Sequence, residues 1–265
     1  MDLMTSRWLY SWLVPLCLGL TSVAQASSLV ETGRRDTLRT QSPSGVVHYV
    51  YVYLPPGYMP EQTYPVLYLM HGFMGNQYSW EVKGNVGRQL DSLIACQAIQ
   101  PLIVAMPYCI PKDTTQAVRQ RSFFYNATHY AQLKRGEFEK TFPEVVDLVQ
   151  DRYPVDTSFQ AVAGLSYGAR VAANVAKMGR YGRVGLFSPV LGRHQLPEAA
   201  SPSRYWVSVG RKDFFFRRTG RRLHRRLSDG GFHCSYREID AGHNWKNWRV
   251  ALLLFLKDWI PVDPE

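Results

Sequence analysis

Cysteine is scarce in this sequence, with four residues among 265. One of them, Cys17, lies in a predicted leader segment, and the remaining three are an odd number, which is not typical of a disulfide framework. Cys96 and Cys109 bracket a predicted strand at 101–107 that would hold their ends about 20 Å apart at ~3.3 Å per residue. We therefore expect no bridge between this pair, while a bridge from Cys234 to either one stays open.

The sequence also lacks the spacings that mark metal and cofactor sites. It contains no C-x-x-C pair and no cluster of cysteine and histidine, which are the usual signs of zinc or thiol redox chemistry. We therefore expect no metal and no other cofactor. Internal repeats and low-complexity linkers are missing too, so a chain of this length is predicted to form one domain of catalytic size.

No apolar run near the N-terminus is long enough to cross a membrane. The run Trp8–Leu20 contains Ser11 and Pro15 and is shorter than the ~20 residues that a spanning helix needs. It is followed by Ala24-Gln25-Ala26, whose small residues fit the −3 and −1 positions of a signal-peptidase site. Residues 1–26 resemble a bacterial secretory signal peptide cleaved after Ala26, which would leave a single domain at 27–265. The predicted location is the periplasm or outside the cell, and a membrane anchor is the alternative.

Acidic residues are few, with 21 Asp and Glu against 31 Lys and Arg, so the formal net charge is +10. Six arginines lie on one side of a predicted helix at 217–229, with two leucines opposite: Arg217, Arg218, Arg221, Arg222, Arg225 and Arg226. A solvated face is the simpler interpretation. The alternative is a patch that holds the protein to an acidic envelope polymer or an anionic lipid surface. The chain carries no nucleic-acid recognition motif, so nucleic acid is not an expected partner.

Apolar segments bounded by glycine and proline predict seven strands, at 46–54, 64–70, 101–107, 159–165, 184–188, 204–210 and 233–239. Helical patterns lie between them, at 83–96, 137–152, 167–179, 217–229 and 245–259. This alternation predicts an α/β fold with a mostly parallel central sheet and helices on both faces. The first strand is expected to form an antiparallel hairpin with the second through Pro55-Pro56-Gly57. The stretches 108–136 and 189–203 follow strand ends and are expected to roof the site, because ligands bind beyond the carboxyl ends of strands.

The segment Gly164-Leu165-Ser166-Tyr167-Gly168 joins a predicted strand to a helix rich in small residues. A G-x-S-x-G motif in this setting is typical of a nucleophile elbow, in which glycines let strand and helix pack closely around a strained serine. An ordinary tight turn is the alternative. The context favours Ser166 as a nucleophile, which then needs a base and an acid that orients the base.

His243 follows the last predicted strand and precedes the last helix, so it belongs at the same sheet edge as Ser166. The other six histidines lie in strands, in polar helix or loop sequence, or, for His71, before a glycine that favours a different role. Asp213 follows the strand at 204–210, and the order Ser166, Asp213, His243 is the one found in α/β-hydrolases. Asp240 is closer to His243 in sequence, but a residue three positions away across a turn is better suited to cap or brace the loop.

The segment His71-Gly72-Phe73-Met74-Gly75 closes the second predicted strand. A glycine-containing loop at this place can direct a backbone N–H into the cleft, and with the N–H of Tyr167 it would form an oxyanion hole. We expect the donors to be the backbone N–H groups of Phe73 and Tyr167. An ordinary strand-to-helix turn is the alternative.

Four segments together resemble the putative esterase family of α/β-hydrolases, which includes esterase D, feruloyl esterase domains and secreted mycolyltransferases. They are YPVLYLMHGFMGNQYSW (64–80), AVAGLSYGA (161–169), VSVGRKD (207–213) and AGHNWKNWR (241–249). The resemblance covers about residues 45–260 and implies an α/β-hydrolase fold. It also implies that Ser166, Asp213 and His243 form a catalytic triad and that the loop after His71-Gly72 supplies an oxyanion N–H. The chain departs from many relatives at Ala169, where they have another glycine.

These features predict a secreted serine carboxylic-ester hydrolase that forms an acyl-enzyme with a small-molecule or glycan-linked ester. Acyl transfer to a sugar or another alcohol is an alternative reaction. A non-catalytic envelope-binding protein on a hydrolase scaffold is the alternative outside enzymes, because a fold alone does not imply activity. The complete set of serine, aspartate and histidine favours the enzyme.

Overall fold

A computed structural model describes residues 31–41, 45–110, 136–178, 181–191 and 203–262. The predicted leader at 1–26 lies outside these residues. Most of the two stretches that were expected to cover the site, 108–136 and 189–203, also lies outside them. The described residues belong to one compact unit, Glu31–Glu265. None of the helices among them is long and apolar enough to span a membrane.

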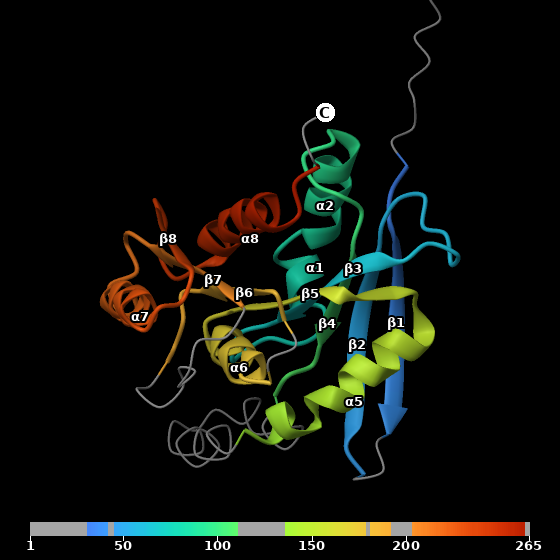
Figure 1. The fold of residues 1–265 in the computed structure, drawn as a ribbon, viewed down its shortest axis with the longest axis horizontal. Helices are drawn as coiled ribbons and strands as arrows, with labels where there is room; N and C mark the ends of the chain where they lie inside the picture. The colour runs from blue at the N-terminus through green and yellow to red at the C-terminus, as the bar shows by residue number, and fades with distance from the viewer. Residues whose placement is uncertain (1–30, 42–44, 111–135, 179–180, 192–202, 263–265) are drawn as a thin grey trace, which may run out of the picture. The chain divides into compact units, whose positions relative to one another are not determined.

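The core of the unit is an eight-stranded sheet (Figure 1). Its strands lie in the order β1-β2-β4-β3-β5-β6-β7-β8, and every pair from β4 to β8 is parallel. The strands are β1 Arg34–Gln41, β2 Val47–Leu54, β3 Tyr64–Met70, β4 Ile103–Pro107, β5 Val155–Leu165, β6 Arg183–Phe187, β7 Arg204–Gly210 and β8 Cys234–Ile239. All seven predicted strands are present, and the predicted α/β-hydrolase architecture is confirmed.

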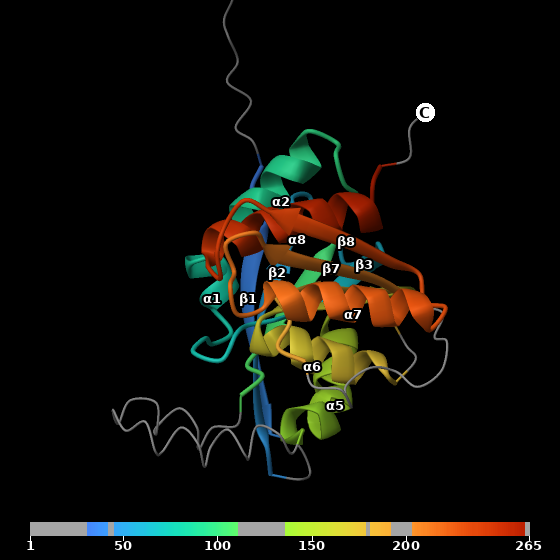
Figure 2. The same ribbon diagram turned by 90° about the vertical axis from the view of Figure 1, so that its left-hand side faces the viewer.

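Helices cover both faces of the sheet (Figures 1 and 2). Alternation along β3 shows the two layers. Tyr68 and Met70 pack with α5 (Glu137–Arg152) and α6 (Tyr167–Ala176). Leu67 and Leu69 pack with α2 (Val86–Ala95) and α8 (Trp245–Trp259) on the other face. Each apolar layer is buried, as expected for a parallel sheet covered on both sides. The helices are α1 Ser79–Val82, α2 Val86–Ala95, α5 Glu137–Arg152, α6 Tyr167–Ala176, α7 Arg217–Asp229 and α8 Trp245–Trp259.

Two predictions about the N-terminal strands were wrong or incomplete. The strand at 34–41 was not predicted, because as an edge strand it buries only Leu38 and otherwise carries polar and charged residues. The expected hairpin between the first two predicted strands does not form. β2 instead pairs antiparallel with β1 and β4, and the nine residues between β2 and β3 are long enough to carry the chain past β4.

The three cysteines in the described residues are free thiols: Cys96 is exposed, Cys234 is half-buried and Cys109 is buried. The prediction that Cys96 and Cys109 do not bridge is confirmed, and Cys234 pairs with neither. Burial raises the pKa of the Cys109 thiol and raises that of Cys234 to about 12, so both stay protonated at neutral pH.

Candidate active site

Ser166 lies at the junction of β5 and α6. Strand β5 ends at Leu165, α6 begins at Tyr167, and Ser166 between them has φ 54° and ψ −113°. A φ in this region costs a residue other than glycine about 1–3 kcal/mol. The surroundings impose it, since the Ser166 N–H donates to the Phe187 carbonyl at 2.8 Å and the Ser166 carbonyl accepts from the Val190 N–H at 3.4 Å. Ser166 therefore stands on a strained strand-to-helix turn.

Two glycines let this strand and helix approach each other. A Cβ at Gly164 would lie 2.4 Å from the backbone of Gly168, and a Cβ at Gly168 would lie 2.4 Å from the carbonyl oxygen of His71. Both positions therefore exclude any larger residue. The close contact also brings the first turn of α6 against the end of β3, so that the Ser166 turn and the loop after β3 are neighbours.

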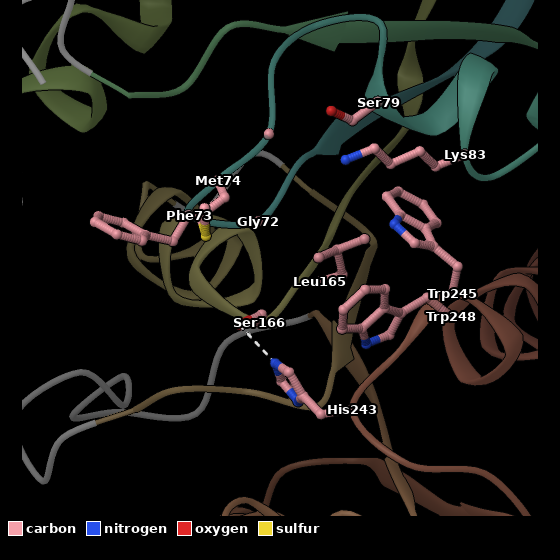
Figure 3. Close-up of a pocket in the computed structure, with 11 residues that line it drawn as sticks. Gly72, Phe73, Met74, Ser79, Lys83, Leu165, Ser166, His243, Trp245 and Trp248 are labelled. Atoms are coloured by element: carbon pink, nitrogen blue, oxygen red, sulfur yellow. Dashed lines mark hydrogen bonds between the residues drawn. The ribbon is translucent and has the colours of Figure 1, made fainter. Parts of the chain in front are cut away.

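Ser166, His243 and Asp213 form a continuous hydrogen-bonded chain. His243 Nε2 lies 3.0 Å from Ser166 Oγ (Figure 3). On the other side of the ring, His243 Nδ1 lies 2.8 Å from Asp213 Oδ2. With its proton on Nδ1, the ring donates to the carboxylate and can accept the hydroxyl proton of Ser166. The three side chains come from the carboxyl ends of β5, β7 and β8, so the structure brings together the residues that the sequence pointed to.

The carboxylate of Asp213 is buried and surrounded by donors. Burial by itself raises its pKa, but hydrogen bonds from His243, the Phe216 N–H and the Ser188 hydroxyl outweigh this and leave the pKa below its ordinary value. Asn247 supports Ser188 in turn, with its Nδ2 donating to Ser188 Oγ at 2.9 Å. Asp213 is therefore held ionised and in a fixed orientation.

Sequence reasoning missed Ser188 and Asn247, both completely buried. Ser188 directly follows β6 and has φ 47°, so the only available signal was a polar residue at the carboxyl end of a predicted strand. Asn247 lies in the first turn of α8, where a polar residue is common, and its sequence context gave no sign of burial.

The alternative acid, Asp240, lies outside this arrangement. Its carboxylate is 3.2 Å from the Lys212 ammonium, and 67% of each side chain is exposed. The hydrogen bond from Lys212 lowers the pKa of Asp240. Asp240 thus braces the surface of the turn that leads to His243, and Asp213 is the carboxylate that contacts the ring.

The loop after β3 is held by the buried ring of His71. Nδ1 donates to the Gly72 carbonyl at 2.8 Å, and Nε2 accepts from the Cys109 N–H at 3.2 Å. Burial lowers the pKa of His71 to about 4, so the ring is neutral at physiological pH and can donate and accept at the same time. The Gly75 N–H donates to the Gly72 carbonyl at 2.9 Å, which closes a turn around Phe73 and Met74.

Phe73 and Tyr167 lie on two sides of the Ser166 turn. The loop that carries Phe73 approaches the serine closely, since a Cβ at Gly72 would lie 3.7 Å from Ser166 Cβ. Tyr167 begins α6, and the N–H groups of a first helical turn point out of the positive end of the helix dipole. The ring centroids of Phe73 and Tyr167 are 6.4 Å apart. Both residues thus belong to segments that adjoin Ser166, where oxyanion-hole donors are expected.

A pocket of about 330 Å³ opens beside Ser166 and His243. Its wall is mainly apolar, with Trp245 and Trp248 on one side, Phe73 and Met74 on the other, and Lys83 as a charged group (Figure 3). The His243 ring itself is held between Phe216, at 4.7 Å, and Trp248, at 5.0 Å between ring centroids. Pockets of this size and composition bind small organic groups.

A family model and a curated relative match parts of this chain. The model of the family described as Putative esterase matches residues 47–210. This segment includes Phe73, Ser166 and Tyr167, whereas Asp213 and His243 follow it. The endo-1,4-beta-xylanase/feruloyl esterase of Xylanibacter ruminicola is 34% identical over 125 residues, which is 44% of this chain and 16% of that protein. The chain thus spans 16% of the length of this curated relative.

Solved structures share the fold at low sequence identity. A ferulic acid esterase from Anaeromyces mucronatus in complex with ferulic acid has a TM-score of 0.73 at 19% identity, covering 89% of this chain and 93% of that one. The S-formylglutathione hydrolase of Staphylococcus aureus has a TM-score of 0.66 at 16% identity, covering 86% and 97%. The chain therefore belongs to the putative esterase family, and its fold is that of the α/β-hydrolases.

Proposed function

We propose that this chain is an exported carboxylic-ester hydrolase in which Ser166, His243 and Asp213 act as a catalytic triad. The observation that carries the proposal is the chain of hydrogen bonds from Ser166 through His243 to the buried Asp213, at 3.0 and 2.8 Å. A serine on a strained turn with a base and an orienting carboxylate is the arrangement that activates a hydroxyl for acyl transfer.

In the first half-reaction Ser166 Oγ attacks the ester carbonyl carbon while His243 Nε2 takes the hydroxyl proton. Asp213 stabilises the imidazolium that forms and keeps its Nδ1–H in place. The backbone N–H groups of Phe73 and Tyr167 donate to the oxyanion, where preorganised donors act in a site with little water. When the intermediate collapses, the C–O bond breaks, His243 returns the proton to the departing alkoxide, and the acyl group stays on Ser166.

In the second half-reaction water attacks the acyl-enzyme. His243 removes a proton from the water, the same backbone donors hold the new oxyanion, and the proton then passes to Ser166 Oγ as the carboxylic acid leaves. The indole and phenyl groups of the pocket favour an apolar or aromatic acyl group. Because relatives are described as feruloyl esterases, hydroxycinnamoyl esters are the first substrates to test.

Export and a partner outside the cytoplasm are part of the proposal. Residues 1–26 support export through their apolar run and small-residue cleavage site. The arginines of α7 support association with an anionic surface of the envelope. Edman sequencing of the protein recovered from a periplasmic or culture fraction tests export, and Ser27 is the expected first residue.

The test of the reaction compares the wild type with Ser166→Ala on short-chain and aromatic acyl esters. The wild type should turn over at least one ester and react with a fluorophosphonate probe, and Ser166→Ala should do neither, because the attacking atom is gone. A wild type that neither reacts with the probe nor cleaves any simple ester would favour the binding-protein alternative. Addition of sugars and alcohols to the same assay tests acyl transfer, which would appear as a new ester in place of free acid.

A further inference from the structure

The turn between β7 and α7 exposes two adjacent phenylalanine rings. Phe214 is 87% exposed and Phe215 is 84% exposed. The turn is well fixed, because Asp213 Oδ1 accepts from the Phe216 N–H at 3.1 Å and the Asp213 carbonyl accepts from the Arg217 N–H at 3.0 Å. Large apolar groups held outward on a fixed turn mark an interaction surface rather than a mobile tip.

Helix α7 continues from this turn along one side of the molecule (Figure 2). Several of its arginine side chains are exposed to solvent. Gly220, Leu223 and Leu227 form its buried side, and Arg218, Arg222 and Arg225 lie on the opposite side. These three arginines are exposed, and none has a carboxylate within ion-pair distance among the described residues. Arg221 differs, because it pairs with Glu238 at 2.6 Å. Arg218 lies in the first turn of α7, four residues after Phe214 and three after Phe215 in the sequence.

We propose that Phe214, Phe215, Arg218, Arg222 and Arg225, here called the Phe–Arg face, dock the protein on an anionic lipid bilayer. Charge alone would fit any polyanion, including an acidic polysaccharide. The two rings decide between them, because a bilayer offers an apolar interior for aromatic side chains beneath its anionic headgroups, and a hydrated polymer does not.

Docking through this face would also bring the pocket next to the bilayer. Phe216 follows Phe215 and packs on the His243 ring, with centroids 4.7 Å apart. The exposed rings and the Ser166 pocket therefore lie at the same edge of the sheet. Docking deepens the association with an anionic surface that is part of the proposed function, and the position of the pocket beside the bilayer rests on the proposed catalysis. Docking does not depend on catalysis, since Ser166→Ala should bind vesicles as the wild type does.

The experiment measures co-sedimentation of the purified protein with vesicles of phosphatidylcholine, with and without phosphatidylglycerol, at low and high salt. We expect binding to the anionic vesicles. Replacing Arg218, Arg222 and Arg225 with glutamine should weaken it about 100-fold at low salt, because each cation near an anionic surface contributes roughly fivefold. Replacing Phe214 and Phe215 with serine should weaken it by about tenfold or more, also at high salt, since apolar insertion is not screened.

A charge-matched control removes three exposed arginines elsewhere. Arg34 and Arg39 lie on β1, at the opposite edge of the sheet from β8, and Arg88 lies on α2. Glutamine at these positions should leave vesicle binding within about threefold. The α7 triple variant should keep its unfolding temperature and turn over a small neutral ester within a few-fold of wild type.

Three results would overturn the proposal. The wild type could remain in the supernatant with anionic vesicles. The control could lose binding as much as the α7 variant, which would indicate net charge alone. Binding could also be independent of Phe214 and Phe215 and be matched by soluble polygalacturonate, in which case the arginines recognise a polyanion and not a bilayer.

Discussion

The loops that follow β3 and β8 each place a histidine at the same edge of the sheet, in opposite environments. His71 is buried, and its two ring nitrogens bond to backbone groups of Gly72 and Cys109. The side chain of His243 is 27% exposed, and its nitrogens face a carboxylate and a hydroxyl. The comparison shows that the partners of the two nitrogens, more than the position at a strand end, decide whether a histidine holds the backbone or can transfer protons.

The same difference in hydrogen-bond partners gives the two rings different roles. Protonation of His71 would remove the acceptor that the Cys109 N–H needs and would bury an uncompensated charge. Protonation of His243 places a cation beside the ionised Asp213. The first ring is suited to fix the loop that carries Phe73, and the second to take up and return a proton.

The largest expected effect comes from breaking the His243 side of the comparison. Asp213→Asn keeps the shape of the side chain but can favour the wrong ring tautomer, and we expect kcat to fall by about 10²–10⁴-fold, as for a triad acid. The measurement is kcat on one activated ester, together with thermal unfolding. Asp240→Asn is the matched control, and because its ion pair is exposed, its rate and unfolding temperature should stay near the wild-type values. An inactive Asp240→Asn beside an active Asp213→Asn would reverse the assignment.

We expect the buried His71 ring to have an intermediate effect, seen as a dependence of the free energy of unfolding on pH. Burial lowers the folded pKa of His71 from 6.5 to about 4, so between these values the unfolded state binds the proton more readily. Above pH 6.5 the His71 ring is neutral in both states and does not lower the free energy of unfolding. As the pH falls from 6.5 to 4, preferential protonation of the unfolded state lowers that free energy by about 3 kcal/mol. Urea unfolding of wild type and His71→Gln across this range measures it.

Because other groups titrate in both proteins, the informative quantity is the difference between the two slopes. His71→Gln should be less stable than wild type at pH 7 but should lose less stability on acidification. Parallel pH profiles for the two proteins would show that His71 is not the neutral buried ring described above.

The smallest effect is expected from the support behind Asp213. Ser188→Ala removes a donor to the carboxylate and leaves Asn247 Nδ2 without its acceptor, which should cost about 1–3 kcal/mol of unfolding free energy and lower kcat several-fold. Ser158→Ala is the control, since that hydroxyl bonds to Asp156 at the surface at 2.6 Å. Equal behaviour of the two variants in chemical denaturation would argue against a supporting role for Ser188.

Much of the fold could be predicted because the inner parallel strands, β3 to β7, carry buried apolar runs with glycine or proline nearby. The meeting of Ser166, Asp213 and His243 followed from their places after strand ends. The edge strand β1 gave no such pattern, since Leu38 is its one buried side chain. The pairing of β2 with β4 depends on contacts between distant segments. Ser188 and Asn247 were missed for a similar reason, because their burial and hydrogen bonds arise only when β6, β7 and α8 pack together.

The order of the strands along the chain also determines when the site can form. Ser166 comes from β5 in the middle of the sheet, and the loop that carries Phe73 comes from its neighbour β3, so these parts can assemble early. Asp213 and His243 follow β7 and β8, the last two strands to be made. A nascent chain would therefore carry an elbow serine without its base until residue 243 has docked. The hydroxyl therefore gains the base that activates it only when the last strand has joined the sheet, and an incomplete or partly folded chain has no activated serine.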